Sequence, residues 1–237
     1  MYLSILNQIN VADTVADSAA AIESTEKTLS ILKLITSGGV GGILIMITLF
    51  ILSIIAVYIF IERYLTIKKA TKEDINFMNE IKDFIHDGKL EAARTLCHRT
   101  PTPISRMIEK GVNRIGKPLG DIATAIENTG KLELFKLEKN LATLATISGA
   151  APMIGFLGTV IGMILAFHEM ASAGGNVDVE MLSEGIYTAM VTTVAGLIVG
   201  ILAFIGYNSL VAKVENVVFK MEARTTEFLD ILNEPAK

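Results

Sequence analysis

The chain has 237 residues, of which 51% are hydrophobic, and its mean hydropathy is +0.51. These values are typical of an integral membrane protein, because a soluble domain of this length has shorter apolar runs. The formal net charge of −4 gives no indication of nucleic-acid binding. The single cysteine, Cys97, excludes an intrachain disulfide and a cysteine-based metal cluster.

Residues 1–37 form a mixed, mildly acidic N-terminal segment. A partial apolar face at Ile22, Leu29, Leu32 and Ile35 indicates an interfacial helix that leads into the membrane, and a solvated helix without a special role is an equal alternative. The segment lacks the basic start and compact apolar core of a signal peptide. We therefore expect the first span to act as an uncleaved insertion signal.

The first predicted span covers residues 38–62. Residues 40–61 contain no charge and are rich in Ile and Leu, and about 20 such residues suffice to cross a bilayer. Glu62 ends the charge-free run, and three lysines follow closely at Lys68, Lys69 and Lys72.

Residues 63–139 are predicted to form a helical block outside the membrane. Apolar residues recur there at helical spacing, and the pattern is interrupted by turn residues around Gly88, at residues 100–103 and at residues 116–118. From Leu119 onward the pattern is helical without an obvious stop. We therefore expect one long helix that begins in water and continues into the second span.

The second predicted span covers residues 140–170, and residues 140–168 carry no Asp, Glu, Lys or Arg. Small residues at helical spacing allow close contact between helix backbones in a membrane. Pro152 predicts a kink whose freed carbonyl group needs a partner. The helix-packing candidates of this span are Pro152, Gly155, Gly158 and Gly162.

A loop at residues 171–184 is predicted to precede the third span, residues 185–212, which again carries no charge. Gly196 and Gly200 form a Gly-x-x-x-Gly pair, which is typical of close helix packing in membranes. Residues 213–237 continue an apolar stripe on a charged helix. The third span is therefore expected to extend well beyond the membrane.

The distribution of basic residues predicts the orientation. Of the 21 Lys and Arg residues, 15 lie in residues 63–139, four lie in residues 213–237, and none lies in residues 171–184. Basic residues favour the cytoplasmic side. The block at 63–139 and the C-terminus are therefore predicted to be cytoplasmic, with the N-terminus and the 171–184 loop outside.

Four threonines are the candidate polar groups within the membrane: Thr159 in the second span and Thr188, Thr192 and Thr193 in the third. Their hydroxyls can line a hydrated path or bond to a neighbouring helix. Alternatively, each hydroxyl bonds to the carbonyl of its own helix one turn earlier. The small-residue stripes favour the first explanation, with the two spans packing at an oligomeric interface.

No carboxylate lies within the cores of the three spans, although an intramembrane carboxylate is the usual sign of an ion carrier. Glu169 and Glu184 lie at the outer ends of spans and are expected at headgroup level. A carrier group would therefore come from a partner. No metal-ligand spacing, nucleophile set or phosphate-binding loop is visible, so neither an enzyme nor a cofactor is predicted.

Two stretches resemble the ExbB/TolQ/MotA proton-channel family. The first runs from Ala142 to Pro152 and continues through Gly155-Phe156-Leu157-Gly158-Thr159 to Met163. The second comprises separated positions in the last span: Gly185, Ile186, Thr193, Gly196, Leu197, Tyr207 and Asn208. The resemblance extends over roughly residues 40–232.

This resemblance implies an all-α integral membrane protein of the bacterial inner membrane, with three spans and long cytoplasmic helical extensions. It implies a homopentamer around a pore that holds a dimer of single-span ExbD/TolR-like subunits. An Asp on the partner helix would carry protons, and the motion would drive a TonB- or TolA-like protein. Thr159 and Thr193 match pore-lining threonines of ExbB.

One position departs from the family pattern, because ExbB and TolQ carry Glu where this chain has Thr188. The transported ion therefore stays open between H⁺ and Na⁺. The alternatives to an ExbB/TolQ-like motor are a Na⁺-driven or MotA-like stator and an oligomeric membrane scaffold without ion flux. The MotA branch has four spans and a larger cytoplasmic block, whereas three spans are visible here.

Overall fold

The computed structural model describes residues 39–72, 76–172 and 179–233, and this part of the chain is helical without any strand. The all-α prediction is therefore confirmed. The predicted interfacial helix in residues 1–37 and residues 173–178 of the predicted 171–184 loop lie outside the described residues, and the rest of that loop is helical. The helices are α3 (Gly39–Thr71), α4 (Phe77–His86), α5 (Leu90–Arg99), α6 (Pro103–Val112), α7 (Leu119–Glu138), α8 (Leu141–Ser172) and α9 (Val179–Asn233).

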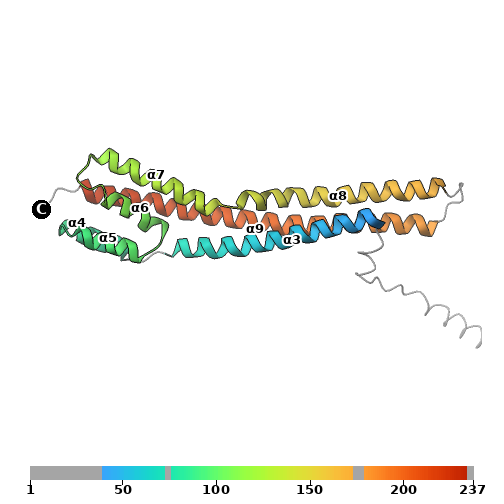
Figure 1. Ribbon diagram of the computed structural model, residues 1–237, viewed down its shortest axis with the longest axis horizontal. Coiled ribbons are helices and arrows are strands. Elements are labelled where there is room, and N and C mark those ends of the chain that lie inside the picture. Colours follow the sequence, from blue (N-terminus) through green and yellow to red (C-terminus); the bar gives the residue numbers. More distant parts are fainter. Residues whose placement is uncertain (1–38, 73–75, 173–178, 234–237) are drawn as a thin grey trace, which may run out of the picture.

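The helices form one elongated bundle that is organised around α9 (Figure 1). With 55 residues, α9 is about 80 Å long and extends along the whole bundle. Helices α3 and α8 pack against its first half, and we call these parts the membrane half. Helices α4, α5, α6 and α7 gather around its second half, which we call the charged half.

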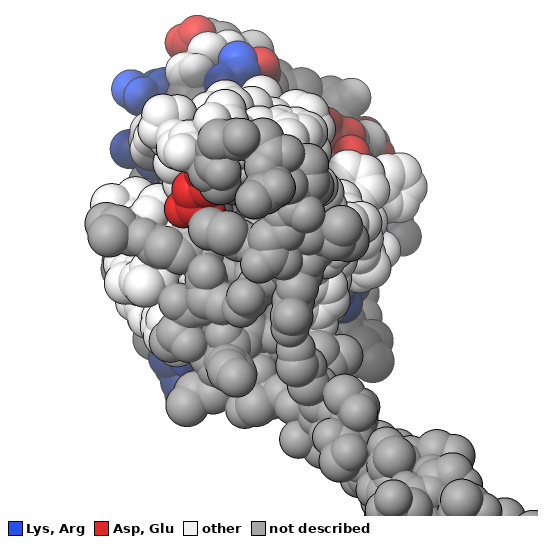
Figure 2. Space-filling view, turned by 90° about the vertical axis from the view of Figure 1, so that its right-hand side faces the viewer, with Lys and Arg blue, Asp and Glu red and all other residues white. Residues whose placement is uncertain are grey.

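The membrane half contains helices that are long and apolar enough to cross a bilayer. Three stretches satisfy this criterion: Gly41–Thr71 in α3, Leu119–Ser172, which comprises α7 and α8, and Gly185–Asn233 in α9. Their outer faces expose large apolar side chains, and this arrangement is stable in lipid but not in water. In the end-on view of Figure 2, charged side chains lie mainly at the rim, and uncharged ones fill most of the remaining described surface. The prediction of a three-span membrane protein is confirmed.

The charged half has its own apolar core, built from the stripes that the sequence shows. Ile81, Ile108 and Phe228 are completely buried there, and they come from α4, α6 and α9. The expected interruptions are turns: Gly88 and Gly116 adopt positive φ angles of 69° and 96°, which favour glycine. The C-terminal part of α9 therefore serves as the central helix of this second core.

The expected continuous helix from residue 119 into the second span is wrong. Helix α7 ends at Glu138, and α8 begins at Leu141. Between them, Asn140 has a φ angle of 65°, a left-handed conformation that ends regular α-helix. Asparagine tolerates this conformation better than most residues, whereas the sequence pattern around it contains neither proline nor glycine.

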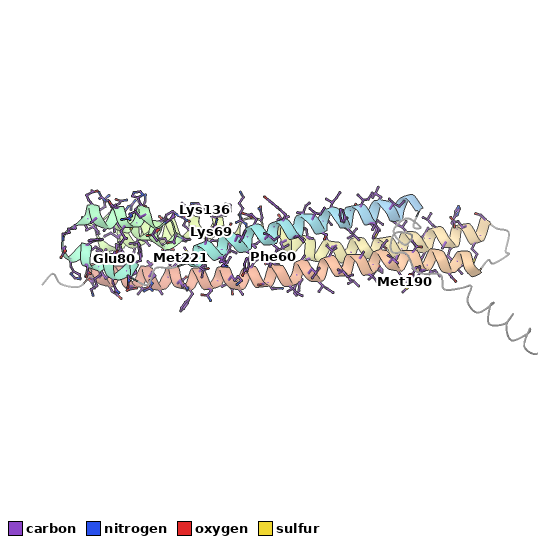
Figure 3. All side chains as sticks on the ribbon, turned by 90° about the horizontal axis from the view of Figure 1, so that it is seen from below. Phe60, Lys69, Glu80, Lys136, Met190 and Met221 are labelled. Atoms are coloured by element: carbon purple, nitrogen blue, oxygen red, sulfur yellow. The ribbon has the colours of Figure 1, made fainter. Side chains whose placement is uncertain are left out.

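Buried charges mark the level at which the two halves meet. Arg63 is 5% exposed and donates a hydrogen bond of 2.9 Å to the carbonyl oxygen of Lys136. Glu133 is 3% exposed and pairs with Arg106 and with Lys136, the latter at 2.6 Å. Figure 3 shows Lys136 at the same level along the bundle as Lys69, between Phe60 and Glu80. Pairing of these charges offsets their burial and joins α3 and α6 to α7.

Cys97 should be chemically inert in the folded chain. Its side chain is buried in α5, and burial together with the nearby Glu109 carboxylate raises the pKa of the thiol to about 12. At pH 8 roughly one Cys97 side chain in ten thousand is then in the reactive thiolate form. We expect negligible maleimide labelling of the native protein within minutes and complete labelling after denaturation in SDS.

The neighbouring residue provides a control for this experiment, because the His98 side chain is largely exposed. The variant His98→Cys should take up one maleimide per chain in the native state and two after denaturation. Rapid labelling of the native unmodified chain would show that Cys97 is accessible and would contradict the described packing.

Candidate site at the contact between α8 and α9

The contact between α8 and α9 is the closest helix packing in the membrane half, and glycines make it possible. A β-carbon at Gly155 would lie 2.7 Å from the carbonyl oxygen of Thr192. A β-carbon at Gly196 would lie 2.5 Å from the carbonyl oxygen of Ala151. Both obstacles are backbone atoms that cannot rotate away, so only glycine fits at these two positions.

The remaining packing candidates lie along the same contact. The ring of Pro152 lies against Gly200, where a β-carbon would be 2.5 Å from the proline Cγ. Proline donates no hydrogen bond to the Ser148 carbonyl one turn earlier, and this oxygen also faces Gly200. Gly158 faces Thr192, and Gly162 faces Ala189. The structure therefore uses both small-residue stripes within one chain, whereas the sequence interpretation assigned them to an oligomeric interface.

Two threonine hydroxyls bond to the same carbonyl across this contact. Thr192 is 3% exposed and donates to the Gly155 oxygen at 3.2 Å and to the Ala189 oxygen at 2.7 Å. Thr193 is half-buried and donates to the Gly155 oxygen at 3.0 Å. The single hydroxyl proton of Thr192 is shared between its two carbonyl acceptors, whereas that of Thr193 is donated to the Gly155 oxygen. These bonds fix the rotation of α9 against α8.

Thr159 lies one turn beyond Gly155 on α8, and residues four apart share one face of a helix. Its hydroxyl donates to the Phe156 oxygen of its own helix at 2.6 Å, and its side chain is half-buried. Of the two explanations for the threonines, bonding within the helix therefore holds for Thr159, and bonding across helices holds for Thr193. Thr192 does both, and its shorter bond is the one within α9. Thr159 and Thr193 both flank the contact with part of their side chains accessible.

A cavity of about 180 Å³ lies beside this contact, between α3, α8 and α9. We call it the threonine cavity, because Thr188 and Thr192 line it. Thr188 is 6% exposed, and Gly42 contributes the wall from α3. The volume has room for several water molecules, and hydroxyl groups provide the hydrogen-bond partners that buried water needs.

Glu169 also lines the threonine cavity, at the end of α8 farthest from the charged half. The sequence interpretation assigned this carboxylate to the headgroup level without a role. One signal was present: the small-residue stripe through Gly158 and Gly162 reaches Ala166 and then Glu169 at the same helical spacing. Within the described residues, His, Cys, Asp and Glu form no group of three that could hold a metal ion.

The sequence of the chain matches a family of known proteins. The model of the MotA/TolQ/ExbB proton channel family matches residues 99–223, more than half of the chain. A biopolymer transport protein ExbB homolog of Methanothermobacter thermautotrophicus is 30% identical over 200 residues, which cover 81% of this chain and 67% of that protein.

Two bacterial relatives match over shorter stretches. ExbB of Aquifex aeolicus, a biopolymer transport protein, is 39% identical over 103 residues, which cover 43% of this chain and 69% of the relative. The Tol-Pal system protein TolQ of Haemophilus influenzae is 33% identical over 104 residues, which cover 44% of this chain and 45% of TolQ. With its three spanning helices and its matching family model, the chain belongs to the MotA/TolQ/ExbB proton channel family.

Proposed function

We propose that the chain is the pore-forming subunit of an ion-driven motor of the ExbB/TolQ kind in the bacterial inner membrane, with its C-terminus in the cytoplasm and its N-terminus in the periplasm. One observation carries the proposal: hydroxyls flank a tightly packed helix pair in spans that contain no charged residue. Such a pair offers polar groups to a passing ion without binding it strongly.

The ion carrier would come from a partner. Residues 40–61, 140–168 and 185–212 have no carboxylate, which is the group that usually carries an ion within the membrane. A homopentamer around a dimer of single-span ExbD/TolR-like subunits would bring an Asp next to Thr159 and Thr193. The names of the relatives, which refer to biopolymer transport and to the Tol-Pal system, support a partner of this kind.

We expect the transported ion to be H⁺, with Na⁺ as the alternative, because hydroxyl groups and waters suit either ion. The motor needs no bound cofactor, since one charge crossing ~100 mV releases about 2.3 kcal/mol. The energy would reach a TonB- or TolA-like protein and thereby the outer membrane. An oligomeric scaffold without ion flux and a MotA-like stator are the competing proposals.

Ion flux through liposomes separates these proposals. The full chain would be purified and reconstituted together with a single-span ExbD/TolR-like protein from the same organism, and flux would be followed with pH-sensitive and Na⁺-sensitive dyes under an imposed potential. We expect flux of one ion when both proteins are present and none with this chain alone. A stable complex that conducts neither ion would support the scaffold and overturn the motor.

A further inference from the structure

A basic groove lies between α3 and α9 where the two helices leave the apolar spans. Its volume is about 1070 Å³, and five lysines line it. None of its lining residues, all of them described, is acidic. We call it the lysine groove, and its lysines are Lys68 and Lys69 on α3, Lys72 directly after α3, and Lys213 and Lys220 on α9.

The position of the lysine groove corresponds to the headgroup level of a bilayer. The charge-free run of α3 ends at residue 61, and that of α9 ends at residue 212. Lys213 is thus the first charged residue of α9 after its span, and Lys69 lies two turns beyond Glu62 on α3. Figure 3 shows Lys69 beyond Phe60 in the direction of the charged half. Lysines at this level attract anionic headgroups.

A second groove continues from the lysine groove into the apolar region. It has a volume of about 360 Å³ and is lined mostly by apolar residues of α3, α8 and α9, among them Val57, Leu144 and Leu202. Ser209 lines both grooves, so the basic and the apolar groove adjoin each other. A free anion would use only the first groove, whereas a lipid has a charged head and apolar chains that match both.

Aromatic residues define the boundary between the two grooves. The Phe60 ring lies against Gly206, where a β-carbon would be 3.0 Å from the ring. The centroids of the Phe60 and Tyr64 rings are 6.1 Å apart, and the Lys213 ammonium lies 5.2 Å from the centre of the Tyr64 ring. This cation–π contact holds Lys213 in the lysine groove, one turn beyond the shared Ser209, where a phosphate would lie.

We infer that the two grooves together bind an anionic phospholipid, with its phosphate in the lysine groove and an acyl chain in the apolar groove. Lys213 and Lys220 are two turns apart, about 10 Å along α9, so the lysines extend over more than one phosphate group. We therefore expect cardiolipin, which carries two phosphates, to bind more tightly than phosphatidylglycerol. The inference concerns the lipid surface of the chain and stands apart from the proposed ion pathway.

Native mass spectrometry of the full chain in detergent would test the inference, with cardiolipin, phosphatidylglycerol and phosphatidylcholine added separately. Cardiolipin should be retained most strongly and phosphatidylcholine least. A triple variant should weaken cardiolipin binding by roughly a hundredfold, because each lysine near a membrane surface contributes a factor of several. This variant combines Lys69→Gln, Lys72→Gln and Lys213→Gln.

A control triple variant removes the same charge elsewhere in the charged half, with Lys82→Gln, Lys110→Gln and Lys117→Gln, and should keep cardiolipin binding within twofold. A further variant, Ser209→Trp, fills the junction of the two grooves without changing the charge, and it should also weaken cardiolipin binding.

Competition with inorganic pyrophosphate distinguishes a lipid, whose phosphate and acyl chain use both grooves, from a free phosphate, which would use the lysine groove alone. We expect a millimolar excess of pyrophosphate to leave cardiolipin bound. Three results would overturn the inference: displacement of cardiolipin by pyrophosphate, equal retention of phosphatidylcholine, or an equal loss of binding in the control triple variant. Ion flux in liposomes is measured separately, so a failed motor proposal leaves this test unaffected.

Discussion

Ion flux should fall to background when Thr159 and Thr193 are both replaced by valine. Valine has the shape of threonine but no hydroxyl group, so both accessible hydroxyls beside the α8–α9 contact disappear. The helix pair itself should stay assembled, because Thr192 still donates to the Gly155 oxygen. The measurement is flux in liposomes that contain both subunits, together with the mass of the purified complex.

The control variant also carries two Thr→Val changes, at Thr48 in α3 and at Thr146 in α8. The Thr48 hydroxyl donates to the Leu44 oxygen and the Thr146 hydroxyl to the Ala142 oxygen, each at 2.9 Å within its own helix. The variant with valine at both of these positions should conduct normally, and serine at positions 159 and 193 should restore most of the flux. Full flux in the Thr159→Val, Thr193→Val variant would remove these residues from the ion pathway.

The second large effect is expected on stability, for the variant Gly155→Ala. The added methyl group would meet the Thr192 carbonyl at 2.7 Å and the Gly196 Cα at 3.1 Å, so α8 and α9 must separate. Overpacking of this kind costs about 1–3 kcal/mol, and separation also lengthens the hydrogen bonds to the Gly155 oxygen. We expect a lower midpoint of thermal unfolding in detergent and a reduced yield of complex.

Gly149 provides a matched control, because it lies in the same helix and a β-carbon there would have no atom within 4 Å. Alanine is the better helix former by about 1 kcal/mol, so Gly149→Ala should leave the midpoint unchanged or raise it. If both variants behave alike, the close approach of α8 and α9 does not determine stability.

The spans could be predicted from the sequence because their signal is physical and local. A run without charges long enough to cross a bilayer has few other stable environments, and the runs at 40–61, 140–168 and 185–212 correspond to α3, α8 and α9. The apolar stripe with Ile104 and Ile108 likewise predicts the buried face of α6. In both cases the residues of one continuous stretch of the chain are sufficient for the prediction.

Features that depend on tertiary packing could not be predicted in the same way. The glycine stripes indicate close helix contact but not which helix makes it, and the structure pairs α8 with α9 of the same chain. Asn140 interrupts a helix without proline or glycine, so the break depends on how α7 and α8 pack. The lysine groove combines residues of α3 and α9 that are nearly 150 positions apart, and no local pattern relates them.

The difference between α9 and the α7–α8 pair has a mechanical consequence. Helix α9 is a single rod from the membrane half to the charged half, whereas the parallel path through α8 and α7 has a joint at Asn140. A rod transmits rotation or tilt along its whole length, and a joint absorbs it. A displacement of α9 at the Thr192 level would therefore be carried along α9 to the core around Phe228, where α6 and α7 pack against this helix.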